Sequence, residues 1–221
     1  MKKVLLIVNP KAGGSGQRLT EQVTTAMVGD FTVDVAQSSA RGDSTRLARE
    51  AVDSGFAAVV AVGGDGTVNE VAQALVHTEV ALGIIPAGTT NVMARSVGIP
   101  DDIHAASCFH ASRLDSGKRR RINVGCIGER YFLFAAGIGL DAEVIRSVEA
   151  RPDRKRRLGH LFFLQQALVT ALRYRGSDPP IKMRIDGGQE ERVVLALFAN
   201  AGPFTNFGRQ PLHVFPHDRL H

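Results

Sequence analysis

The chain has 221 residues, of which 44% are hydrophobic and 22% charged, so it holds enough apolar material for a buried core. Its two cysteines, Cys108 and Cys126, are too few for a disulfide framework or a zinc site, which favours a reducing cytoplasm as its compartment. The apolar run Val4–Val8 is shorter than the roughly 7–15 residues of a signal-peptide core, and no run approaches the ~20 apolar residues of a membrane span.

Short apolar strands alternate with amphipathic helical segments through the first half of the chain. This alternation is typical of a parallel sheet covered by helices on both faces, and it predicts a Rossmann-like α/β domain over residues 1–117. The predicted strands are Val4–Val8, Phe31–Val35, Ala57–Val62 and Ala81–Ile85. The predicted helices lie near Arg18–Val28, Ser44–Ser54, Thr67–Val76, Asn91–Val97 and Asp101–Ser112.

The pattern changes in the second half, which predicts an antiparallel β domain over residues 118–221 with an inserted helical part. Its predicted strands are Arg121–Ile127, Tyr131–Ala136, Ile181–Ile185 and Arg192–Ala199, and its predicted helices are Val144–Ala150 and Leu158–Tyr174. The charge balance changes at the same place. Residues 1–117 carry 9 Lys/Arg against 12 Asp/Glu, whereas residues 118–221 carry 18 against 10. We expect two domains that face different partners.

Three glycine-rich loops follow the first, third and fourth predicted strands. They are Asn9–Gly16, Gly63–Glu70 and Pro86–Asn91. Glycine lets backbone N–H groups approach an anion closely, and a helix that begins behind such a turn adds the positive end of its dipole. Because the carboxyl ends of parallel strands meet at one edge of a sheet, the loops should converge there. They predict a site for the phosphates of a nucleoside triphosphate, centred on Gly63–Thr67.

The glycines also have a simpler interpretation as tight turns, which suits the first loop as well as the phosphate interpretation does. It suits the second loop poorly, because Asp, Thr, Asn and Glu are packed there into eight residues. Asp65 has two interpretations of its own: it caps the helix predicted to start near Thr67, or it handles a metal ion or a hydroxyl proton. We favour the second.

The motifs G-G-D-G-T-x-N-E at Gly63–Glu70, P-A-G-T-T-N at Pro86–Asn91 and N-P-K-A-G at Asn9–Gly13 resemble the diacylglycerol kinase catalytic domain family. That family includes bacterial lipid kinases and the related sphingosine and ceramide kinases. Order and spacing of all three motifs match over residues 1–127. The resemblance implies an α/β nucleotide domain followed by a β-sandwich, with ATP and, by expectation, Mg²⁺ as cofactors and a lipid hydroxyl as phosphoryl acceptor.

The resemblance also implies roles for single residues. Asn9 would shape the nucleotide site, Thr90 would donate to a phosphate oxygen, and Ser38 falls where the family usually has a nucleotide-contacting Thr. Asp65 is the expected catalytic residue. The full expected nucleotide set is Asn9, Ser38, Gly63, Gly64, Asp65, Gly66, Thr67, Val68, Asn69, Gly88, Thr89, Thr90 and Asn91.

Three departures from the family pattern bear on these expectations. Many bacterial members have Asp after the G-T-x-N motif, where this chain has Val92, and Asp-x-Gly where it has Asn123-Val124-Gly125. Both missing carboxylates would support magnesium, so no metal ligand is assigned. The family's β-sandwich also continues past His221 with an acidic motif that supplies the catalytic base. We therefore expect a fragment, with its sandwich incomplete and its base downstream.

Two basic clusters, Lys118–Arg121 and Arg154–Arg157, have two interpretations. They are solvated surface segments, or they bind anionic lipid headgroups at the inner face of a membrane. Nucleic acid is not expected as a partner, because no aromatic residues are interleaved with the charges. Two other functions remain open: a kinase with a soluble acceptor, since NAD kinases share the G-G-D-G-T motif, and a nucleotide-binding regulatory module without catalysis.

Overall fold

The structure is a computed structural model that describes residues 1–12, 16–150, 165–166, 168–170, 172, 180–200, 205–207 and 210–212. The chain divides into two compact units. One comprises Met1–Phe134 with Ala199–His221, and the other comprises Ala135–Phe198. The domain boundary predicted between residues 117 and 118 stays a prediction.

Unit one is built on a parallel four-stranded sheet in the order β2-β1-β3-β4, which confirms the α/β, Rossmann-like prediction. Its strands are β1 (Lys2–Val8), β2 (Phe31–Gln37), β3 (Ala58–Gly63) and β4 (Ala81–Pro86). After β2 the chain crosses back over β1 to place β3 on the other side. The strand order therefore reverses between β1 and β3, and in open α/β sheets ligands bind outside the carboxyl ends of the strands at such a switch point.

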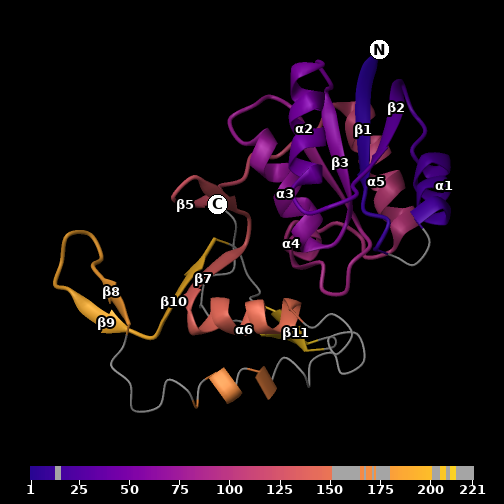
Figure 1. Cartoon of the computed structure of the whole chain (residues 1–221). Helices are drawn as coiled ribbons and strands as arrows, with labels where there is room; N and C mark the ends of the chain where they lie inside the picture. The colour runs from indigo at the N-terminus through magenta and orange to yellow at the C-terminus, as the bar shows by residue number, and fades with distance from the viewer. Residues whose placement is uncertain are drawn as a thin grey trace. The chain divides into compact units, whose positions relative to one another are not determined.

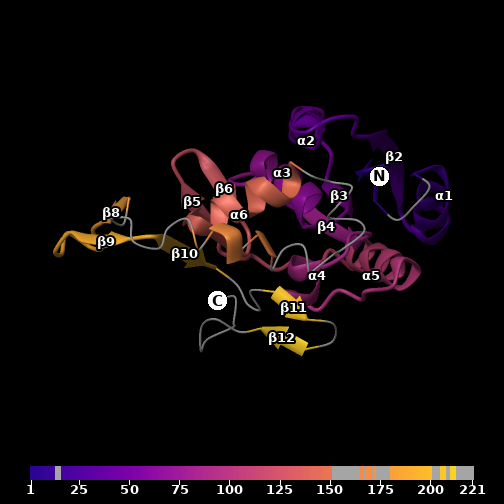
Figure 2. The same ribbon diagram turned by 60° about the horizontal axis from the view of Figure 1, so that its bottom comes forward.

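Helices cover both faces of the sheet (Figure 1). They are α1 (Gly16–Ala26), α2 (Asp43–Asp53), α3 (Asp65–Leu75), α4 (Val92–Ser96) and α5 (Ile103–Ser116). Helices α1 and α5 pack against each other on one face, and α2 and α3 pack against each other on the opposite face, as Figures 1 and 2 both show. The fold thus has three layers, with the sheet in the middle.

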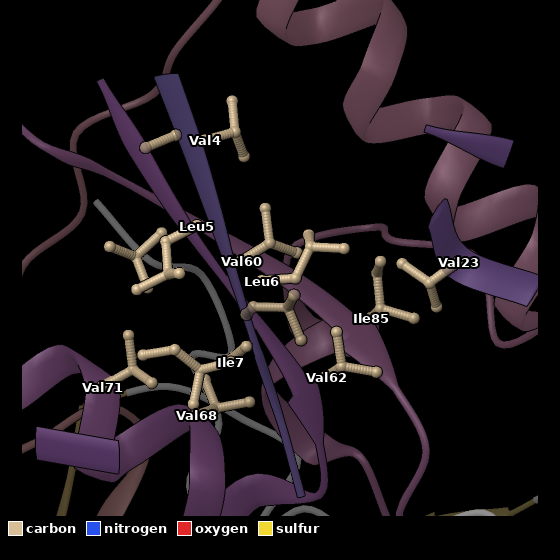
Figure 3. Close-up of a cluster of buried hydrophobic side chains, with 14 of the residues drawn as sticks. Val4, Leu5, Leu6, Ile7, Val23, Val60, Val62, Val68, Val71 and Ile85 are labelled. Carbon is tan, nitrogen blue, oxygen red and sulfur yellow. The ribbon is translucent and has the colours of Figure 1, made fainter. Parts of the chain in front are cut away.

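Side chains of β1 alternate between the two layers of the core. Leu5 and Ile7 point toward Val68 and Val71 of α3, whereas Leu6 points to the face that holds Val23 of α1 (Figure 3). Each of these side chains is at most 8% exposed. Fully burying one such side chain contributes roughly 1.5–3 kcal/mol to stability. The packing fixes α3 against the central strands, and so fixes the loops at their carboxyl ends.

Helix α5 is longer than predicted. We expected it to end at Ser112, but it continues to Ser116, and Gly117 ends it with a φ of 65°. At its start the carboxylate of Asp102 accepts a hydrogen bond of 2.8 Å from the backbone N–H of Ala105. The helix therefore has a side-chain cap at one end and a glycine in the left-handed region at the other.

Short antiparallel strand pairs dominate the described part of the second half, as predicted. The pairs are β5 (Gly125–Ile127) with β6 (Arg130–Phe132), β8 (Ile181–Met183) with β9 (Glu191–Val193), and β11 (Thr205–Phe207) with β12 (Gln210–Leu212), the last labelled in Figure 2. Strand β7 (Ala135–Gly139) pairs with β10 (Leu195–Ala199), and helix α6 (Leu140–Glu149) follows β7.

Two strands predicted as continuous are interrupted. The predicted strand Tyr131–Ala136 breaks between β6 and β7, where the carbonyls of Leu133 and Phe134 accept hydrogen bonds from the side chain and backbone of Asn200. The predicted strand Arg192–Ala199 breaks between β9 and β10, where the carbonyl of Val194 accepts from the N–H of Leu140. Partners distant in sequence end both strands, so local periodicity did not show the breaks.

The predicted helix Leu158–Tyr174 falls mostly outside the described residues. Those that are described, 165–166, 168–170 and 172, are helical. The basic cluster Arg154–Arg157 lies outside the described residues altogether. Among the helices that the structure describes, none is both long and apolar enough to cross a bilayer.

A buried histidine holds the outer edge of the sheet. The ring of His110, on α5, is 9% exposed, and its Nε2 lies 3.0 Å from the backbone nitrogen of Ile84 and 2.8 Å from the carbonyl oxygen. Ile84 is on β4, which pairs with β3 and ends the sheet among the residues that the structure describes. Burial lowers the pKa of His110 and the charge of Arg113 lowers it further, while the hydrogen bond to Ile84 opposes this shift.

The lowered pKa of His110 predicts a loss of stability in acid. The unfolded chain takes up a proton below about pH 6.5, whereas the folded chain resists it, so the free energy of unfolding should fall as the pH drops from 7.5 to 5. We expect His110→Gln to flatten this slope in urea titrations at the two pH values. His104→Gln, on the exposed side of the same helix, is the control and should keep the wild-type slope. Equal slopes for all three proteins would contradict the assignment.

Candidate functional site

The loops after β1 and β3 meet at the point where the strand order reverses. The backbone N–H of Asn9 donates to the carbonyl of Val62 at 3.0 Å, which continues the β1–β3 pairing by one residue. The Asn9 side-chain amide donates to the hydroxyl of Thr67 at 3.1 Å, and its carbonyl oxygen accepts from the N–H of Lys11 at 3.0 Å. Asn9 therefore connects the first loop to the first turn of α3.

Helix α3 begins at Asp65, two residues earlier than predicted. Gly63 ends β3, and Gly64 is the N-cap residue, with no side-chain hydrogen bond capping the helix. The first N–H groups of a helix have no partner within the helix. Here those of Asp65, Gly66 and Thr67 lie at the positive end of the helix dipole, directly at the switch point. This is the arrangement that favours an anion.

The loop after β4 packs tightly against this turn. A Cβ atom on Gly88 would lie 2.5 Å from the Cα of Gly64, so the two glycine backbones touch. Asn91 holds the loop in shape: its side chain accepts from the N–H of Gly88 at 3.0 Å and donates to the Gly88 carbonyl at 2.9 Å. Asn91 is 8% exposed and has a φ of 46°. Its left-handed backbone and its two hydrogen bonds shape the loop, and its contact with nucleotide stays a prediction.

Asp65 does not cap its own helix. One carboxylate oxygen accepts from the hydroxyl of Thr90 and the other accepts from the backbone N–H of Met93, each at 3.0 Å. Met93 is the second residue of α4, whose N-cap Asn91 makes no side-chain capping bond. Asp65 thus caps a different helix and ties the second loop to the third.

The other expected nucleotide residues lie in varied settings. Ser38 is 7% exposed, and its N–H donates to the carbonyl of Val8 at the end of β1. Val68 is 2% exposed and packs in the core, so only its backbone faces the loops. The Asn69 amide contacts the carbonyl of Tyr131 at 3.4 Å, and Thr89 is exposed. None of these contacts tests a role in binding, and all four roles stay predictions.

Two features near the site were not anticipated from the sequence. The side chain of Gln73 donates to the Tyr131 carbonyl at 2.8 Å and accepts from the Tyr131 N–H at 3.0 Å, so it holds the β5–β6 hairpin on α3. Its spacing of four residues from Asn69 on α3 was the available signal. A pocket of about 210 Å³ lies beside this contact. It is lined by Arg41, Gly42, Thr45, Glu70, Gln73 and Arg130.

Two residues of the basic cluster Lys118–Arg121 contact Glu79 and are therefore less available to bind lipid headgroups. Arg119 donates to the backbone carbonyl of Glu79 at 2.8 Å, and Arg121 forms an ion pair with the Glu79 carboxylate at 3.2 Å. Exposed pairs of this kind contribute at most about 1 kcal/mol. They give two of the four basic residues a structural role.

No cluster of three or more His, Cys, Asp or Glu side chains suited to a metal ion occurs among the described residues. Val92, which stands where many bacterial members of the family have Asp, is 3% exposed and apolar. The carboxylate of Asp65 already accepts two hydrogen bonds. We therefore assign no Mg²⁺ ligand among the described residues.

Comparisons with known proteins agree with this geometry. A model of the diacylglycerol kinase catalytic domain matches residues 3–127, more than half of the chain. The chain belongs to the diacylglycerol kinase catalytic domain family. This confirms the resemblance in the three loop motifs.

Similar proteins carry lipid kinase names. A "Probable lipid kinase YegS-like" protein of Chromohalobacter salexigens is 38% identical over 173 residues, which cover 76% of this chain and 53% of that protein. "Diacylglycerol kinase" of Bacillus subtilis is 33% identical over 168 residues, with coverage of 74% and 54%. The chain thus spans about half the length of these curated relatives.

Solved structures show the same relation. The crystal structure of a diacylglycerol kinase from Bacillus anthracis has a TM-score of 0.69 and 28% identity, and the match covers 95% of this chain and 67% of that one. The solved structure therefore agrees with the family assignment.

Proposed function

We propose that this protein is an ATP-dependent lipid kinase that transfers the γ-phosphoryl group to a lipid hydroxyl, diacylglycerol or a related lipid. The observation that carries the proposal is the first turn of α3. It lies at the switch point of the sheet without a side-chain cap, and Asn9 and the Gly88 loop hold it on two sides. Family membership supports the reaction class.

Phosphoryl transfer requires mainly positioning and charge stabilisation, which suits a site made of backbone N–H groups. In the proposal, the N–H groups of Gly64, Asp65, Gly66 and Thr67 hold the phosphates, and the exposed hydroxyl of Thr89 adds a donor. Mg²⁺ would enter bound to the phosphates of ATP. Ser38 and Asn69 belong to the same proposed nucleotide set.

The pocket beside α3 is the proposed place for the nucleoside part of ATP. It shares α3 with the phosphate turn, because Glu70 follows Thr67 within one turn of the helix. A carboxylate suits ribose hydroxyls, and the guanidinium groups of Arg41 and Arg130 suit stacking on a base or pairing with a phosphate. The pocket has a volume of about 210 Å³ and is lined by polar and charged side chains.

Peripheral contact with anionic membrane lipids is a further part of the proposal. A basic residue near such a surface contributes ~1 kcal/mol. The cluster Lys118–Arg121 is partly engaged by Glu79, so we assign the contact chiefly to Arg154–Arg157.

The reaction is tested by transfer from γ-labelled ATP to three acceptors: diacylglycerol in mixed micelles, sphingosine in mixed micelles, and NAD⁺ in solution. We expect label in a lipid and none in NAD⁺. Label in NAD⁺ alone would favour the NAD-kinase-like alternative. Saturable ATP binding with no labelled acceptor would favour a regulatory module. His104→Val, a substitution away from the site, is the control for a loss of activity that has no connection with the site.

A further inference from the structure

We propose that Asp65 is a positioning residue that joins the two phosphate loops into one unit, and that it acts through this link rather than as the acceptor of the substrate proton. The inference rests on the proposed nucleotide site and deepens it. Asp65 is the first residue of α3, yet both its oxygens bind groups of the loop after β4.

The contacts of Asp65 leave the N-terminus of α3 open. An Asp in the first turn of a helix commonly stabilises that helix's own N-terminus. Here the carboxylate turns to Thr90 and Met93 instead, and Gly64 provides no side chain. The N–H groups at the start of α3 therefore keep their capacity for an external anion.

The same contacts hold the loops after β3 and β4 together. Met93 is the second residue of α4, so its N–H has no acceptor within that helix. Asp65 supplies the acceptor from 28 positions away in sequence. The backbone of Gly88, in the same loop, packs against the backbone of Gly64. This non-bonded contact and the hydrogen bonds of Asp65 together fix the distance between the loops. Phosphates held between them would then meet donors that are already in place, which reduces the entropic cost of binding.

The negative charge of the Asp65 carboxylate is held by neighbouring donors. A carboxylate beside a polyphosphate repels it, but this one lies against the hydroxyl of Thr90 and the N-terminal end of α4. Both carboxylate oxygens are already occupied by the link, one by the Thr90 hydroxyl and one by the Met93 N–H. Neither oxygen is therefore free to accept a substrate proton without a change in these hydrogen bonds.

Replacing Asp65 with Asn removes the negative charge but can keep both hydrogen bonds of the link. In Asp65→Asn the side-chain carbonyl can accept from the Met93 N–H, and the amide nitrogen can donate to the Thr90 hydroxyl oxygen. Asp65→Ala removes both contacts. Asp101→Ala is the matched control: it removes an exposed carboxylate that pairs with Arg95, at the other end of α4.

The experiment measures amide hydrogen exchange at Met93 and affinity for a non-hydrolysable ATP analogue in these proteins. We expect Met93 to exchange at least about tenfold faster in Asp65→Ala, while the N–H of Arg95, bonded to the Asn91 carbonyl, reports whether α4 itself stays formed. Affinity should fall by about tenfold in Asp65→Ala. Asp65→Asn should recover most of both losses, and Asp101→Ala should show neither.

Two results would overturn the inference. One is unchanged Met93 exchange in Asp65→Ala. The other is an Asp65→Asn protein in which Met93 is protected but nucleotide affinity is as low as in Asp65→Ala, because the charge would then matter and the link would not. If the wild-type chain bound no nucleotide, the proposed function would fail by itself, and the exchange rates alone would decide whether the link exists.

Discussion

Gly88→Ala should lower both the stability of the chain and its affinity for nucleotide. The added Cβ would lie 2.5 Å from the Cα of Gly64 and 2.8 Å from the Oδ1 of Asn91. The first neighbour is backbone and the second is held by two hydrogen bonds, so neither moves easily. Overpacking of this kind costs about 1–3 kcal/mol of unfolding free energy. The loops would separate, and ATP-analogue affinity should fall by more than about tenfold.

Urea denaturation and calorimetric titration measure the two effects. Thr89→Ala is the matched stability control, because Thr89 is exposed and adjacent, so its replacement should change the unfolding free energy by less than about 0.5 kcal/mol. A Gly88→Ala protein as stable as Thr89→Ala, with wild-type affinity, would show that the two loops do not depend on their backbone contact.

Gly66→Val should remove nucleotide binding without unfolding the chain. Apart from its chain neighbours and the backbone of its own helix, a Cβ on Gly66 would meet no atom within 4 Å, so the fold has room for a branched side chain. Gly66 is the second residue of α3, and valine has a better helix propensity than glycine. Side chains of a helix tilt toward its N-terminus, which is where the phosphates are proposed to bind. The valine would occupy their place.

The melting temperature separates the two causes of lost binding. We expect Gly66→Val to melt no lower than the wild type while its affinity falls by at least about tenfold. His104→Val places the same side chain at the second residue of α5, whose start is capped by Asp102, and should bind like the wild type. A loss of affinity accompanied by a lower melting temperature would point to misfolding and count against the proposed contact.

Sequence reasoning located the loops because their position follows from local rules. Apolar periodicity marked the strands, helix segments between them required a parallel sheet, and parallel strands bring their carboxyl ends to one edge. Asn9 and Thr67 were therefore expected close together, and their side chains lie 3.1 Å apart. Val68 also followed the helical period, although its side chain serves the core rather than the loops.

The sequence did not show which distant groups the individual side chains contact. Asp65 meets Met93 because β3 and β4 pair in register from Ala58 with Ala81 to Gly63 with Pro86, and a shift of one residue would separate them. Gln73 meets Tyr131 across 58 positions by the docking of a hairpin that has no periodic signal. Such contacts depend on the packed arrangement, whereas glycine content and hydrophobic period depend on the chain alone.

The central claim is that the turn Gly63–Thr67 holds the phosphates of a nucleoside triphosphate. Calorimetric titration of a non-hydrolysable ATP analogue into the wild-type chain and into Gly66→Val tests it most directly. The account predicts one saturable site in the wild-type chain and an affinity at least about tenfold lower in the folded variant. Equal affinities in two folded proteins, or no binding by the wild-type chain, would contradict it.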